Sequence, residues 1–222
     1  MKPFAVCVPS KFWSLWMSIS LLAALAVFAS LTARAQSEVP RRVTQEIDET
    51  RLTTLVGHIY PAANAANDRG PLDDSATLGH IVLMLKRSDA QQRELDAFVD
   101  QAHNARSTGY HKWLTPDDFG HRFGPADEDV AAVTAWLESK GFVIEDIPPS
   151  KTHITFTGTV GQMRQAFHTE IHRLNVNGAA HQATMSEPQI PAALAPVVSG
   201  FRQLLERFGL LGCHWLVVGH CV

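Results

Sequence analysis

The apolar residues of this chain fall into short runs whose spacing predicts both strands and helices. A continuous run at Ile81–Leu85 fits a strand buried on both faces. Ile154 and Phe156 alternate with polar neighbours, which predicts a half-buried strand. Asn177-Gly178 is a strong hairpin signal. The other predicted strands cover residues 142–147 and 168–176, with a return arm of the hairpin at 181–185.

Three segments have the signals of helices. Ser88 and Gln91 form a capping box ahead of apolar residues at helical spacing, and Thr159 and Gln162 form another. The acidic residues 127–129 suit a helix start because of the helix dipole, and the helix that follows is predicted to end near Gly141. Between the first two helices, residues 110–123 are predicted to be a loop with one short helical turn after Pro116.

The element order predicts the fold class. It runs strand, helix, helix, strand, strand, helix, strand, which is a split βαβ pattern with one extra helix. We therefore predict an α+β, ferredoxin-like open sandwich, with an antiparallel-rich sheet covered by helices on one face. In such a fold, either Val82 and Met84 or the alternate residues of the first strand point away from the helices. An apolar patch on an open sheet face marks an interaction site.

The ends of the chain differ from its middle. Lys2 and Lys11, an apolar run and Ala33-Arg34-Ala35 are typical of a secretory signal peptide over residues 1–35, cleaved before Gln36. An uncleaved membrane anchor is the alternative, and either predicts export, to the periplasm or the exterior. The remaining predicted segments are a flexible or extended lead-in at 36–77, a folded domain at 78–201 and an aberrant tail at 202–222.

Composition narrows the class of protein. An apolar fraction of 45% in 222 residues suits a globular domain with a core, and a net charge of -3 argues against a general nucleic-acid binder. The three cysteines, Cys7, Cys213 and Cys221, leave the middle of the chain without any, so its core must hold it together. The 11 histidines would add positive charge on acidification.

Three blocks of sequence carry a family resemblance. Tyr110–Gly141, Phe156–Gly178 and Ser186–Phe201 resemble, in order, the activation propeptide of the sedolisins, secreted serine-carboxyl peptidases of the pro-kumamolisin type. The resemblance covers approximately Leu52 to Phe201 and implies the same ferredoxin-like fold. It also implies a domain that assists folding of a sedolisin-type catalytic domain, in cis or in trans, and inhibits it until acidification and self-cleavage.

The resemblance implies no catalytic, cofactor or metal residue in this chain. The serine nucleophile, glutamate base and calcium site of the family belong to the catalytic domain, whose motifs cannot be matched here, so enzyme activity is left open. One alternative is a fragment of a serine-type endopeptidase gene, inactive as written, with truncation or a frame break near residue 202. Another is a secreted, histidine-rich metal-binding protein.

Two sets of residues are candidates for contact with a partner. The first set is a crowded aromatic segment: Tyr110, His111, Trp113, Phe119 and Phe123. It fits either a satellite core under the first two helices or a packing surface for a partner enzyme. The second set is the outward side of the first strand, Val82 and Met84.

Histidines supply the remaining candidates. On a strand, His168, Glu170 and His172 would share one face and could bind zinc, or they could simply line the open sheet face. The tail residues Cys213 and Cys221 could pair or, with adjacent histidines, form a zinc clip. We also predict a set of pH-sensing residues: His121, His153, His168, His172 and His181.

Overall fold

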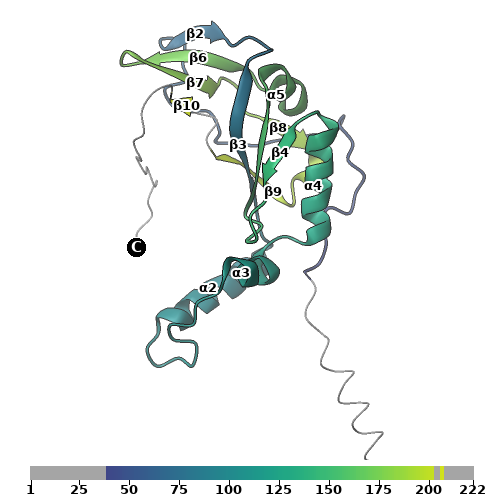
Figure 1. The fold of residues 1–222 in the computed structure, drawn as a ribbon, viewed down its shortest axis with the longest axis vertical. Coiled ribbons are helices and arrows are strands. Elements are labelled where there is room, and N and C mark those ends of the chain that lie inside the picture. Colours follow the sequence, from purple (N-terminus) through teal and green to yellow (C-terminus); the bar gives the residue numbers. More distant parts are fainter. Residues whose placement is uncertain (1–38, 203–205, 208–222) are drawn as a thin grey trace, which may run out of the picture. The chain divides into compact units, whose positions relative to one another are not determined.

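The computed structural model describes residues 39–202 and 206–207 (Figure 1). The predicted signal peptide, Cys7, Cys213, Cys221 and nearly all of the tail lie outside the described residues. Within the described part of the chain, no helix is long and apolar enough to cross a membrane.

A four-stranded antiparallel sheet, here called the central sheet, organises the domain. Its strands are β3 (Thr77–Leu85), β4 (Val143–Asp146), β5 (His153–Thr159) and β9 (Val198–Arg202), in the order β4-β5-β3-β9. The strands predicted at 81–85, at 142–147 and around Ile154 and Phe156 are therefore confirmed. β3 alternates between buried and half-buried positions, so the prediction that it is buried on both faces is wrong. The helices cover only one side of this strand.

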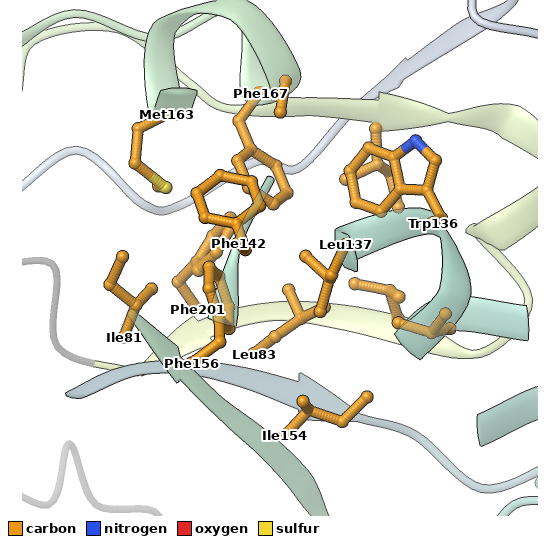
Figure 2. Close-up of a cluster of buried hydrophobic side chains, with 14 of the residues drawn as sticks. Ile81, Leu83, Trp136, Leu137, Phe142, Ile154, Phe156, Met163, Phe167 and Phe201 are labelled. Atoms are coloured by element: carbon orange, nitrogen blue, oxygen red, sulfur yellow. The ribbon is translucent and has the colours of Figure 1, made fainter. Parts of the chain in front are cut away.

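Helices α4 (Asp127–Ser139) and α5 (Val160–Phe167) cover that side, and the main core lies between them and the central sheet. Figure 2 shows Leu83, Phe156 and Phe167 among the converging side chains. The capping box of Thr159 and Gln162 is present at α5. Gly141 follows α4 with a φ of 81°, a left-handed conformation that glycine adopts without a steric penalty.

A second sheet has the order β10-β7-β6-β2. Its strands are β2 (Asp68–Pro71), β6 (Ile171–Val176), β7 (Ala179–Thr184) and β10 (Glu206–Arg207). The predicted hairpin is confirmed: Asn177 and Gly178 join β6 to β7 with φ values of 54° and 84°. However, we expected a strand from His168 as the last strand of the main sheet. His168 instead caps α5 in a left-handed conformation, so the strand starts later, and β9 completes the central sheet.

The predicted flexible or extended lead-in includes two short strands and a buried residue. It contains β1 (Leu52–Thr54), which pairs with β8 (Gln189–Pro191), as well as β2. Val43 is only 1% exposed and belongs to the main core. The two strand pairings join segments more than a hundred residues apart, and Val43 is bound to Asp129, 86 residues away, so no local periodicity in the sequence could reveal these contacts. A short 3₁₀ helix, η2 (Ala192–Leu194), follows β8.

Helices α2 (Asp89–His103) and α3 (Pro116–Phe123), with the loop between them, form a helical hairpin that we call the arm. Figure 1 shows the two helices together. The capping box of Ser88 and Gln91 is confirmed at α2. The predicted single turn after Pro116 is instead an eight-residue helix, because Thr115 and Asp118 form a capping box with Pro116 at the first helical position.

Candidate partner-binding surfaces

The open face of the central sheet carries the first candidate surface. Ile81, Leu83 and Leu85 are buried toward the helices, so Val82 and Met84 are the residues of β3 that point away. Val82 pairs with Thr155 of β5 and Arg202 of β9. Met84 pairs with His153. Val143 of edge strand β4 is 64% exposed and pairs with Thr157.

An ion-pair site borders this open face. His80 has a φ of 51°, within an irregularity of β3, and its Nδ1 lies 2.8 Å from a carboxylate oxygen of Glu145. The Thr157 hydroxyl donates to the same carboxylate. The site therefore joins three strands of the central sheet. Sequence reasoning missed it because the pairing of β3, β5 and β4 brings these residues together, and no motif links them along the chain.

The loop of the arm carries the second candidate surface, which we call the arm tip: Tyr110, His111 and Trp113. The rings of Tyr110 and His111 stack with centroids 3.8 Å apart, and His111 and Trp113 are nearly parallel at 6.0 Å. Tyr110 is 41% exposed and Trp113 is 68% exposed. The arm tip therefore presents an ordered row of aromatic rings to solvent.

The other two aromatic candidates have a packing role. Phe123 is fully buried, and its ring centroid lies 5.5 Å from that of Phe119 and 5.9 Å from that of Phe98 on α2. The guanidinium of Arg122 lies over Phe98 and Phe123, and that of Arg87 lies over Phe119. Such cation–π contacts stabilise the arm from its exposed side. Phe119 and Phe123 therefore fit the predicted satellite core, whereas contact of the exposed rings with a partner enzyme stays a prediction.

The five predicted pH-sensing histidines lie on separate elements. Only His153 is on the open face of the central sheet, beside Met84. His121 lies 3.6 Å from Asp117 on exposed α3, His168 caps α5, and His181 is on β7. His172 Nδ1 lies 2.9 Å from Asp68 and links β6 to β2. The Gly70 N–H, followed by the His172 ring, holds the pKa of the Asp68 carboxyl below its ordinary value.

His168, Glu170 and His172 do not converge on a metal site. His168 is at the end of α5, and Glu170 accepts a hydrogen bond from Arg164 at 3.0 Å. The Nδ1 atom of His172 is hydrogen-bonded to the Asp68 carboxylate. Residues 39–202 contain no cluster of three potential metal-binding side chains. The predicted shared face requires a strand through His168, and that strand begins only at Ile171.

Comparison with known proteins identifies the family. Residues 64–204 match the family described as Pro-kumamolisin, activation domain. The chain is 34% identical over 149 residues to Sedolisin from Pseudomonas sp. (strain 101), a match that spans 66% of this chain and 25% of that protein. It is 29% identical over 184 residues to Xanthomonalisin from Xanthomonas sp. (strain T-22), spanning 83% of this chain and 21% of that protein. The chain therefore belongs to the pro-kumamolisin activation domain family.

Proposed function

We propose that this chain is the activation domain of an exported, acid-acting serine-type peptidase of the sedolisin family. In this proposal it assists folding of the catalytic domain and blocks that domain until release. The family match over residues 64–204 carries the proposal. The signal-like pattern of residues 1–35 supports export.

We further propose that the central sheet is ferredoxin-like. If β3, β4, β5 and β9 are numbered one to four along the chain, the observed order β9-β3-β5-β4 reads 4-1-3-2. With α4 and α5 as the covering helices, this order corresponds to a split βαβ unit. The arm is then an insertion between the first strand and its crossover helix.

Two surfaces are suited to contact the catalytic domain. The open sheet face offers Val82 and Met84 beside the exposed Val143, an apolar strip that the domain's own helices leave uncovered. The arm tip offers Trp113 and Tyr110 held in a stack, and large aromatic side chains of this kind dominate interface energetics. Preorganised rings lose little conformational entropy on binding.

Acidification offers a route to release. Histidine is the side chain whose charge ordinarily changes between pH 5 and 8. His153 and His80 lie on or beside the open face, so added charge there would disfavour an apolar contact. The link between β6 and β2 through His172 and Asp68 has its own pH dependence. The folded-state pKa of Asp68 is lowered, so its contribution to stability is present above the ordinary aspartate value of about 3.9 and is lost only as pH falls through the lowered value.

The test is inhibition of a purified sedolisin-type peptidase by the chain, titrated at near-neutral and acidic pH. We expect tight inhibition that fades on acidification and weakens in Val82→Lys or Met84→Lys. Val99→Lys is the matched control, because Val99 is an exposed valine on α2. Replacing the five predicted histidines together with His80 by glutamine should flatten the pH dependence. A folded chain that inhibits no sedolisin-type peptidase at either pH would refute the proposal.

A further inference from the structure

Residues 39–47, here called the strap, bind the domain through contacts that resemble recognition of a peptide ligand. The strap precedes the family match, which begins at residue 64. Its central residues, Arg42 and Val43, contact α4 and the segments next to β3 and β9. The domain therefore uses residues that lie outside the family region.

The backbone of the strap is bound by one buried carboxylate. Asp129, in the first turn of α4, is 0% exposed. Its carboxylate accepts the Arg42 N–H at 2.9 and 3.0 Å, shared between its two oxygens, and the Val43 N–H at 2.8 Å. A buried carboxylate requires such donors, because an unpaired charge in the interior is costly. The strap thus supplies the hydrogen-bond donors for this buried carboxylate of α4.

The Arg42 side chain is bound by two backbone carbonyl groups. One terminal nitrogen donates to the Pro196 carbonyl at 2.7 Å, and the other donates to the Lys86 carbonyl. Lys86 directly follows β3, and Pro196 shortly precedes β9. Burial lowers the pKa of the Arg42 guanidinium, and Asp129 acts in the opposite direction. The planar, forked guanidinium can reach both carbonyls, which a lysine ammonium would do less well.

The third contact is apolar. Val43 is 1% exposed and lies within the main core, and Ile47 packs partly buried against the same core. The surface therefore contacts three features of the strap. These are its backbone N–H groups, the Arg42 guanidinium, and the β-branched apolar side chain of Val43, which directly follows Arg42.

We propose that this surface is a binding site for an extended peptide containing arginine followed by a β-branched aliphatic residue, and that the strap occupies it as a tethered ligand. Residues 48–51 after the strap are exposed. A cut there would turn a covalent strap into a dissociable ligand. Tethered ligands experience effective concentrations in the millimolar range for short linkers, so a cut strap would be bound less completely at micromolar protein concentration. Proteolysis in this turn would thereby convert a stable domain into a labile one.

The experiment uses the full chain with Asp48–Arg51 replaced by the recognition sequence of a specific endopeptidase. We expect cleavage to lower the denaturant midpoint of unfolding. A synthetic peptide of residues 39–48, added at increasing concentration, should restore the midpoint. The same peptide carrying Arg42→Ala should bind about tenfold more weakly or worse, since two charge-assisted hydrogen bonds are lost. Arg42→Lys should fall between, and Thr44→Ala, at an exposed position, should bind like the native peptide.

An uncut pair of variants makes the test independent of the inserted sequence. Arg42→Ala in the native full chain should lower the denaturant midpoint, whereas Arg93→Ala, at an exposed position on α2, should not. The proposal is overturned if cleavage leaves the midpoint unchanged, or if the Arg42→Ala peptide restores it as well as the native one. Neither result depends on inhibition of a peptidase, so the strap and the proposed function can fail separately.

Discussion

The central sheet region and the arm place their aromatic residues in different ways. In the sheet region, Phe142, Phe156 and Phe167 lie within a single core shared by α4, α5 and the sheet. No residue of α2 or α3 belongs to this core. The arm buries Phe123 in a satellite cluster and exposes Trp113 at its tip. The sheet region is therefore the scaffold, and the arm is a separately stabilised element that holds exposed rings in place.

The sources of stability differ accordingly. The sheet region depends on apolar surface removed from water over many elements. The arm depends on local devices: capping boxes at both helices, and arginine side chains that cover aromatic rings from the solvent side. Substitutions in the core of the sheet region should lower the free energy of global unfolding. Substitutions at the caps or the covering arginines of the arm should mainly increase local opening of the arm.

The largest effect is expected for Phe156→Ala. Phe156 is fully buried, pairs with Ile81 and contacts the Phe142 ring at 4.9 Å. Its loss should lower the free energy of unfolding by about 3–5 kcal/mol, measured by denaturant titration. Phe123→Ala, equally buried but in the arm, should cost less and act mainly on amide exchange of α2 and α3. Equal losses in the free energy of global unfolding for Phe156→Ala and Phe123→Ala would contradict the distinction between the two regions.

Gly120→Ala tests how the arm is attached. A Cβ atom at Gly120 would lie 1.9 Å from the Pro149 carbonyl oxygen, so α3 would have to move away from the turn after β4. We expect a loss of about 1–3 kcal/mol, with faster amide exchange in α3. Gly79→Ala is the control, because its nearest contact would be the Thr157 hydroxyl at 3.9 Å. A neutral Gly120→Ala variant would show that this contact does not hold the arm.

The helix caps give a sharper version of the comparison. Thr159 caps α5 in the sheet region and Thr115 caps α3 in the arm, each within a capping box. Replacing either with alanine should cost its helix about 1 kcal/mol. For Thr159→Ala we expect the full loss in global unfolding. For Thr115→Ala we expect most of it as local opening of the arm, seen by hydrogen exchange; the reverse pattern would contradict this assignment.

Trp113→Ala should have the smallest effect on stability. Trp113 is 68% exposed, so its loss should change the free energy of unfolding by no more than about 0.5 kcal/mol. Inhibition of a sedolisin-type peptidase should nevertheless weaken if the arm tip contacts the enzyme. The paired measurements are denaturant titration and the inhibition constant. Unchanged inhibition would leave the arm tip without a role in binding and the open sheet face as the remaining surface.

Local signals in the sequence predicted much of the domain. The capping boxes at Ser88 and Thr159, the acidic start of α4 and the Asn177-Gly178 hairpin all depend on residues within a few positions of each other. Helix α3 was underestimated because its cap, Thr115 with Asp118, lies in a segment with little apolar periodicity. Strand β9 was missed as a member of the central sheet because its partner, β3, is far away in sequence.

The sequence by itself determined the local elements, the family resemblance and the existence of an apolar first strand with two candidate faces. Only the tertiary structure decided which face is open, since that depends on the side on which α4 and α5 pack. It alone placed His80 beside Glu145 and Arg42 beside Asp129, 87 residues away. Pairing between distant segments is set by the summed burial of the whole core, and no short window of sequence contains that sum.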